Sequence, residues 1–330
     1  MDVHAAEEAD RHILSWVDSI RIFQGQRTEL ERFKIGTFAA LTHSGFASSD
    51  HLLFATKNIA ALMSIDDHYC DEEVEGAIPE LAVARLAGLL PFLEEPQSIS
   101  PGQFGGSDRE AEDPVALAVR DVMHHAALLG SPAQVGRLRR EYVTMCLAMA
   151  GESAYRVAQR TPTLGEYVSQ RPFNGAMACL AAIDIAGGFE LGACEYDRPD
   201  VRGLTLLASS LILLVNDLYS GYKESVTHAR TTNLPTLLCL NSELNLDDAV
   251  DKVVRLHNQQ VRTYLKMEQD VASDASPELS RYLTGLRQWI GGSLEWHTMT
   301  GRYHEREGRP SAPSRPMQFH RKCGCAQPVR

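Results

Sequence analysis

An acidic cluster directly follows an apolar run in the first quarter of the chain. The run ends at Ile65, and Asp66, Asp67 and Asp71 come next, with Glu72 beside them. On an α-helix four residues turn through about 400°, so Asp67 and Asp71 would lie about 40° apart on one face. Carboxylates so close repel one another unless a divalent cation relieves the repulsion, and hard oxygen ligands suit Mg²⁺. The alternative is a solvated helix face, but the apolar run places these residues at the rim of a buried surface.

A second oxygen-rich group ends the longest apolar stretch, the twelve residues 204–215. Asn216, Ser220 and Glu224 follow at positions i, i+4 and i+8. On a helix this spacing aligns an amide oxygen, a hydroxyl and a carboxylate along one stripe. The alternative is a helix that becomes polar where it leaves the core. We expect these three residues to form a second set of metal ligands.

Helical periodicity dominates the segments that must position both groups. Apolar residues recur every three to four positions over 80–93, 114–129, 132–160, 171–193, 200–225, 247–271 and 277–305. Few stretches alternate with period two, and no repeat is apparent. We expect a polar loop at 94–113 and a disordered, basic, Pro-rich tail over 308–330. The sequence therefore predicts an all-α fold with one catalytic domain over 1–307, a helical bundle around an apolar cavity.

Composition restricts the kind of partner. The 330 residues include 32 Lys+Arg and 43 Asp+Glu, a net charge of −11, and no long basic run offers a track for phosphates. Nucleic acid is therefore not an expected partner. The longest apolar stretch is shorter than the roughly twenty residues of a membrane span. The acidic N-terminus lacks the features of a signal peptide, so we expect a cytoplasmic protein that does not bind membranes.

The cysteines agree with that compartment. Five of the seven lie singly in apolar segments, where a thiol usually serves as a small core residue. Cys323 and Cys325 lie close together in the tail, but no second pair completes a zinc set.

The two oxygen-rich groups resemble the metal-binding motifs of bacterial class I terpene synthases. In that family an aspartate-rich motif and an Asn/Ser/Glu triad together bind three Mg²⁺ ions and a prenyl diphosphate. The resemblance assigns as metal ligands Asp66, Asp67, Asp71, Asn216, Ser220 and Glu224. Three residues separate the aspartate pair from the next acid, so Asp71 and Glu72 both remain candidates.

Further family marks occur in the expected order. Arg171, Asn174 and Gly175 resemble the diphosphate-sensing arginine with its linker and effector residues, although the linker is usually aspartate. Arg302 and Tyr303 resemble the arginine–tyrosine pair that the family carries near its C-terminus. Trp289 and Trp296 resemble aromatic residues often found just before that pair.

The resemblance implies how these residues would act together. Three Mg²⁺ ions with Arg171, Lys223 and Arg302 would neutralise the diphosphate as it leaves, and Tyr303 would donate a hydrogen bond to it. The carbocation that remains would need a dry cavity with aromatic faces.

Two other classes compete with a terpene cyclase. A chain-elongating prenyl transferase would carry a second aspartate-rich motif, where this chain has Asn216, Ser220 and Glu224. A non-catalytic helical protein that binds a lipid or a partner would not need both ligand sets intact. A homodimer is compatible with the sequence.

The sequence also gives an expectation for substrate length. The helix before Asp66 is poor in aromatic residues and contains Ala55, Ala60 and Ala61. These small residues favour a wide cavity and hence a diterpene synthase acting on a C20 substrate, geranylgeranyl diphosphate or a bicyclic copalyl-type diphosphate. The alternative is a sesquiterpene synthase acting on farnesyl diphosphate.

Overall fold

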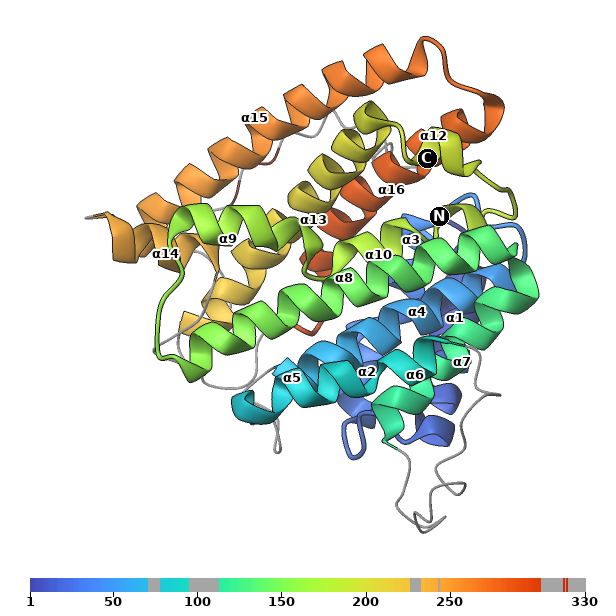
Figure 1. Ribbon diagram of the computed structural model, residues 1–330, viewed down its shortest axis with the longest axis horizontal. Coiled ribbons are helices and arrows are strands. Elements are labelled where there is room, and N and C mark those ends of the chain that lie inside the picture. Colours follow the sequence, from blue (N-terminus) through green and yellow to red (C-terminus); the bar gives the residue numbers. More distant parts are fainter. Residues whose placement is uncertain are drawn as a thin grey trace.

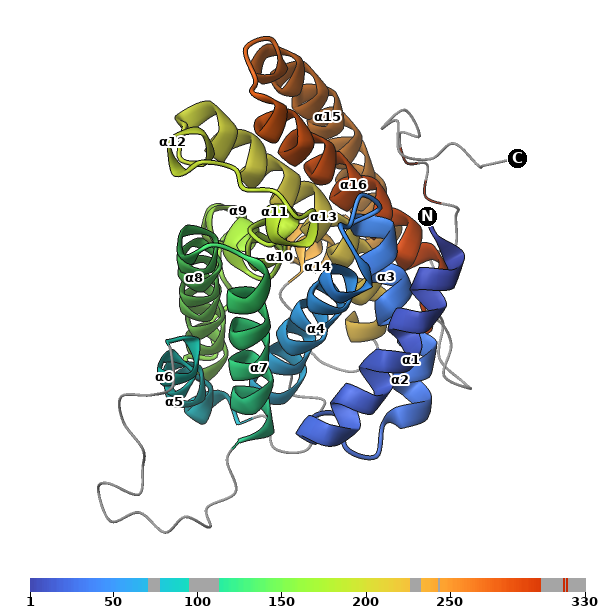
Figure 2. The same cartoon turned by 90° about the vertical axis from the view of Figure 1, so that its right-hand side faces the viewer.

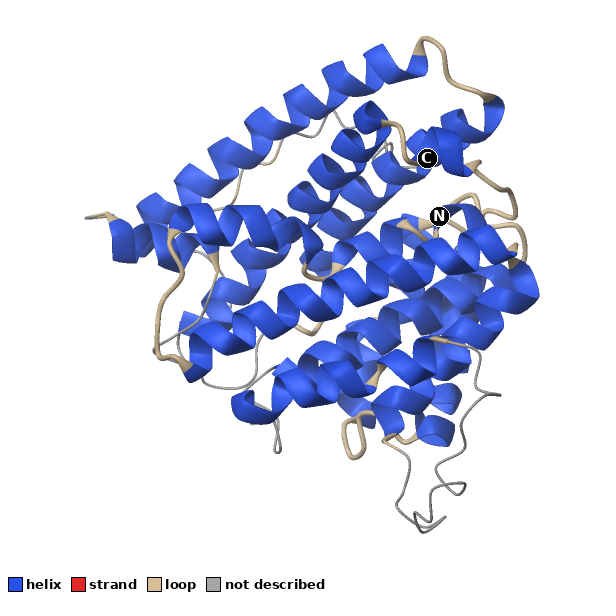
Figure 3. Cartoon of the chain, viewed as in Figure 1, coloured by secondary structure: helices blue, strands red, loops and turns tan. Residues whose placement is uncertain are grey.

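The structure, a computed structural model, describes residues 1–70, 78–94, 113–225, 233–242, 244–303, 317 and 319. For residues 221–225 it describes the backbone but not the side chains. Within these residues all regular structure is helical (Figure 3), which confirms the predicted all-α class. The elements are α1 (Val3–Ile20), α2 (Arg27–Phe33), α3 (Ile35–Thr42), α4 (Ser49–Ile65), η1 (Asp66–Cys70), α5 (Pro79–Gly88), α6 (Leu90–Leu93), α7 (Pro114–Leu129), α8 (Pro132–Val157), α9 (Leu164–Gln170), η3 (Arg171–Phe173), α10 (Ala176–Leu180), α11 (Ile183–Ala186), α12 (Ala193–Tyr196), α13 (Pro199–Ser225), α14 (Leu234–Asn241), α15 (Leu246–Ala272) and α16 (Pro277–Met299).

Side-chain caps set the start of the helices that lead to the site. The Ser48 hydroxyl accepts a hydrogen bond from a backbone N–H of the first turn of α4. Ser131 and Gln134 form a reciprocal capping box at α8, and Thr163 and Glu166 form another at α9. Each cap satisfies N–H groups that a helix start leaves unpaired, which stabilises the helix by about 1 kcal/mol.

The helices form a bundle with short segments inside it. In Figure 1 the long helix α8 crosses the middle of the molecule, and α15 lies along the outside against α13. Figure 2 shows α10 and α11 near the centre. The helix α10 contacts α4, α8, α13 and α16, so it touches α13, which carries the second predicted ligand group, and α4, which leads into the first.

The apolar interior has a main core and a smaller cluster. The smaller cluster joins α9, α13, α14 and α15 through residues such as Tyr167, Leu218, Leu237 and Val253. The stretch Pro199–Ser220 of α13 is long and apolar enough to cross a membrane, but 67% of it is buried inside the bundle. Its apolar character is therefore that of a core helix.

Several predicted boundaries differ from the structure. The predicted helix 171–193 is divided into η3, α10 and α11. Gly175 separates η3 from α10, because its φ of 123° cannot occur within an α-helix. The predicted helix 277–305 ends at Met299. Apart from Glu94, Asp113, Met317 and Phe319, the predicted loop 94–113 and tail 308–330 lie outside the described residues.

Candidate active site

The acidic cluster lies where α4 changes into a π-helical turn. Asp66–Cys70 form this turn, so the α-helical spacing assumed for Asp67 and Asp71 does not hold there, and Asp71 itself lies outside the described residues. Asp66 is exposed, whereas Asp67 is buried. Both carboxylate oxygens of Asp67 accept from the Arg302 guanidinium, with N–O distances of 2.9 and 2.5 Å. The turn thus presents one carboxylate to solvent and directs the next to Arg302.

The turn that follows α16 holds Arg302 in place. The Gly301 N–H donates to the Arg32 carbonyl at 2.8 Å, and the Thr300 hydroxyl donates to the Phe33 carbonyl at 3.0 Å. The guanidinium carbon of Arg302 lies 5.1 Å from the centre of the Phe33 ring, a cation–π contact. The end of α2 therefore fixes an arginine that is about 270 residues away in sequence.

A second arginine contacts the triad helix α13. Arg171 donates from Nε and Nη2 to Asp217 Oδ1 at 3.0 and 2.6 Å, and from Nη2 to Asn216 Oδ1 at 2.9 Å. Asp217 is fully buried and also accepts from the Tyr167 hydroxyl and from the backbone N–H of Leu234 at 3.2 Å. Arg171 therefore holds the first member of the triad and its neighbour at once.

Tyr303 joins the two arginine clusters. Its hydroxyl accepts from Asn216 Nδ2 at 2.9 Å, and its ring stacks on His297 with a centroid distance of 5.2 Å and an angle of 9°. Two hydrogen-bonded groups, Asp67–Arg302 and Tyr303–Asn216–Arg171, thus meet at the turn after α16, because Arg302 and Tyr303 are consecutive residues. Together they connect the turn after α4, the turn after α16, the helix α13 and the turn η3.

Both arginines stay positively charged in this setting. Burial alone would lower the pKa of Arg171, but the neighbouring Asp217 carboxylate outweighs burial and raises it. Burial likewise opposes the charge of Arg302, and Asp67 raises its pKa well above the usual value. Two cations therefore stand at the same end of the bundle, each with a buried carboxylate partner.

The linker and effector positions lie in the turn that follows Arg171. Asn174 Nδ2 donates to Glu152 Oε2 at 2.6 Å. Gly175 has a φ of 123°, a region that favours glycine, and a Cβ built there would lie 3.7 Å from Leu213. Glycine is required at 175 by the backbone, since the space for a methyl group exists.

The remaining triad members occupy the expected helix. Ser220 is buried one turn beyond Asn216 on α13. Lys223 and Glu224 belong to the same helix, but their side chains lie outside the described part of the chain. Among the described residues no three His, Cys, Asp or Glu side chains come together as a metal cluster.

Four residues that contact the motif segments were not predicted from the sequence: Asp217, Tyr167, Glu152, and Arg156, which donates to the Cys70 carbonyl. In the sequence, Asp217 lies one helical turn after Leu213 and directly before Leu218, and both leucines belong to the apolar face of α13. An acid on such a face needs a buried partner, which is a usable signal. The other three contribute through α8 and α9, and no sequence spacing relates those helices to the motifs.

The two tryptophans belong to the core. The Trp296 ring stacks on Phe38 with a centroid distance of 4.2 Å, and its Nε1–H donates to the Phe33 carbonyl at 2.7 Å. Trp289 contacts the same Phe38 edge-to-face and donates to His43. Their role in this structure is to pack α16 against α3.

The chain is similar to known proteins over most of its length. A family model described as terpene synthase family 2, C-terminal metal binding, matches residues 57–263. The 2-methylisoborneol synthase of Streptomyces lasalocidi is 29% identical over 300 residues, 90% of this chain and 62% of that enzyme. The (2E,6E)-farnesyl diphosphate cyclizing 4-epi-cubebol synthase of Streptosporangium roseum is 25% identical over 90% of this chain and 87% of its own length.

A solved structure agrees with the fold. The crystal structure of 2-methylisoborneol synthase from Streptomyces coelicolor A3(2), in complex with Mg²⁺ and 2-fluoroneryl diphosphate, superposes with a TM-score of 0.84. The two sequences are 27% identical, and the match covers 93% of this chain and 95% of that one. The chain thus spans nearly all of that crystallised protein but under two thirds of the Streptomyces lasalocidi enzyme.

Proposed function

The chain belongs to terpene synthase family 2, and we propose that it is a magnesium-dependent cyclase of allylic prenyl diphosphates. One observation carries this proposal: the hydrogen-bonded groups Asp67–Arg302 and Tyr303–Asn216–Arg171 meet at the consecutive residues Arg302 and Tyr303. They bring two largely buried cations to both oxygen-rich motifs at one end of an apolar bundle. A diphosphate that ionises requires this concentration of positive charge beside a dry interior.

The donors of the two motifs fit Mg²⁺. Asp66 offers an exposed carboxylate, Asn216 an amide oxygen and Ser220 a hydroxyl, all hard oxygen ligands. With Glu224 on the same helix and Asp71 after the π-helical turn, they are the residues that would hold the metal. Bound Mg²⁺ acts as a Lewis acid that stabilises the diphosphate leaving group.

The chain's own cations bind and orient the same leaving group. Arg171 and Arg302 present planar guanidinium groups suited to phosphate oxygens, and Lys223 adds a third charge. Asp67 gives both of its oxygens to Arg302, so we assign it an orienting role besides its predicted contact with metal. Tyr303 is held against Asn216 at the same place.

For the substrate we propose an acyclic allylic diphosphate of geranyl or farnesyl length. The relatives named above are 2-methylisoborneol and 4-epi-cubebol synthases, which does not support the expected C20 substrate. The alanines behind that expectation, Ala55, Ala60 and Ala61, have no accessible surface, so they border no space for a substrate. They allow helices to approach one another closely and do not widen a cavity.

Product analysis tests this proposal. Purified protein is incubated with Mg²⁺ and, separately, with geranyl, farnesyl, geranylgeranyl and copalyl diphosphates, and the extracts are read by gas chromatography and mass spectrometry. We expect cyclic products from the C10 or C15 substrate. Turnover of a C20 substrate alone would contradict the proposed length, and turnover of none would contradict the proposed activity.

A further inference from the structure

A polar bridge on α8 connects the two catalytic segments from outside. Arg156 donates from Nη1 to the Cys70 carbonyl and from Nη2 to Glu152 Oε1 at 2.7 Å. The other carboxylate oxygen of Glu152 accepts from Asn174 Nδ2 at 2.6 Å. Cys70 is the last residue of the π-helical turn that begins with Asp66, so three hydrogen bonds join that turn to the linker position.

Each end of the bridge contacts a segment that carries predicted site residues. Arg156 places a cation at the carbonyl of Cys70, which directly precedes the predicted ligand Asp71 in sequence. At the other end, Asn174 lies directly before Gly175, whose φ of 123° makes the turn dependent on its neighbours.

The bridge also accounts for the unusual linker residue. An aspartate at 174 would set a second carboxylate against Glu152, whereas the amide of Asn174 donates to it. A cavity of about 20 Å³ is lined by Glu152, Asn174, Tyr155, Tyr167 and Arg171 among others. This cavity is too small for a prenyl chain.

We propose that Arg156, acting through Glu152, is a positioning residue that couples the Asp66–Cys70 turn to the Asn174–Gly175 turn. This inference rests on the proposed function, because it concerns the alignment of the metal-binding and diphosphate-sensing segments. Ordering of either segment is expected to order the other, since both hold the same carboxylate–guanidinium pair. Loss of the bridge should therefore impair Mg²⁺ use more than it impairs folding.

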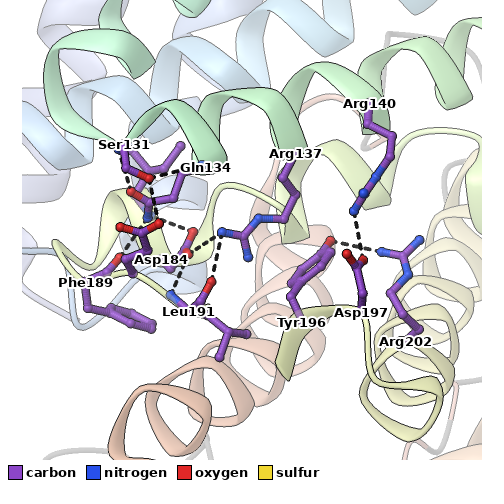
Figure 4. A network of polar contacts seen from close by, with 12 residues as sticks. Ser131, Gln134, Arg137, Arg140, Asp184, Phe189, Leu191, Tyr196, Asp197 and Arg202 are labelled. Atoms are coloured by element: carbon purple, nitrogen blue, oxygen red, sulfur yellow. Dashed lines mark hydrogen bonds and ion pairs between the residues drawn. The ribbon is translucent and has the colours of Figure 1, made fainter. Parts of the chain in front are cut away.

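Hydrogen exchange of the unliganded protein tests the coupling without any substrate. In Asn174→Ala the amides of Asp66–Cys70 should exchange about tenfold faster than in the unaltered protein, because a charge-assisted bond is lost at the far end of the bridge. In an Arg156→Met background the same Asn174→Ala change should have no further effect there. The control is Arg140→Met. Arg140 lies elsewhere on α8 and donates to Asp197 (Figure 4), so its loss should leave the exchange rates of the Asp66–Cys70 amides unchanged.

A charge exchange and a metal titration complete the test. Asn174→Asp should raise the half-saturating Mg²⁺ concentration about tenfold, and adding Glu152→Gln should restore it, because the amide then donates in the opposite direction. Thermal melting within a few degrees of the parent shows that each variant is folded. If Arg156→Met is not folded, Arg156→Gln replaces it, because Gln also removes the guanidinium charge.

The results separate the two proposals. The coupling is overturned if Asn174→Ala does not change the exchange rates at Asp66–Cys70. It is also overturned if Asn174→Ala changes them equally in the unaltered protein and in Arg156→Met, even if the protein is an active cyclase. If the protein turns over no prenyl diphosphate, the function fails and the exchange experiment still decides the coupling.

Discussion

Removing the Asp217 carboxylate should be among the most destabilising single changes near the site. Asp217 is fully buried and accepts hydrogen bonds from Arg171, from the Tyr167 hydroxyl and from the Leu234 N–H. Asp217→Ala leaves a largely buried guanidinium without its charge partner and orphans two further donors. Breaking a buried ion pair from one side costs about 3–5 kcal/mol, so we expect a loss of about 4 kcal/mol in the free energy of unfolding.

Urea denaturation followed by circular dichroism measures this loss. The double variant Arg171→Met with Asp217→Leu should lose less stability than Asp217→Ala, because it leaves no uncompensated charge in the interior. Asp200→Ala is the control, since its pair with Arg198 is half-exposed and should contribute less than about 1 kcal/mol. An unfolding free energy for Asp217→Ala within about 1 kcal/mol of the parent would refute the reasoning.

Three further predictions concern the same end of the bundle and its support. Arg302→Lys keeps the charge but loses the two-point contact with Asp67. Steady-state turnover should therefore fall at least about tenfold while the melting temperature changes little. Full activity would argue against the role of Arg302 in binding the diphosphate. Gly175→Ala has space for its methyl group but not the backbone freedom, so it should lose about 1–3 kcal/mol in urea unfolding, and an unchanged midpoint would contradict this. Burial lowers the pKa of His43 to about 4, so the folded protein keeps it neutral to accept from Trp289. Stability should be complete above pH 6.5 and fall by about 2 kcal/mol by pH 5, and His43→Gln should remove that part of the pH dependence.

Local sequence patterns predicted many of the helices. The apolar period and the proline at the first turn located Pro114–Leu129 without error, because both signals act within a few residues. The i, i+4 relation of Asn216 and Ser220 also held, since one continuous helix carries both. Such features depend on neighbours in sequence, which the reader of a sequence can see.

Features that depend on tertiary contacts were not predictable in the same way. Asp67 was expected among the metal ligands, and the structure shows both of its oxygens on Arg302, 235 residues later in the chain. The bridge from Cys70 through Arg156 to Asn174 involves three separate elements, so no spacing announces it. The break at Gly175 was hidden because its neighbours continue a helical pattern while its φ does not.

The proposed function requires that metal ions and the Arg171–Arg302 end of the bundle together ionise a prenyl diphosphate. Release of inorganic diphosphate from farnesyl and geranyl diphosphates tests it most directly, measured with Mg²⁺, with EDTA, and with Mg²⁺ restored after EDTA. We expect release with Mg²⁺, none with EDTA, recovery when Mg²⁺ is restored, and none from the variant that combines Asn216→Ala with Glu224→Ala. Release that persists in EDTA, or that the double variant retains in full, would contradict it.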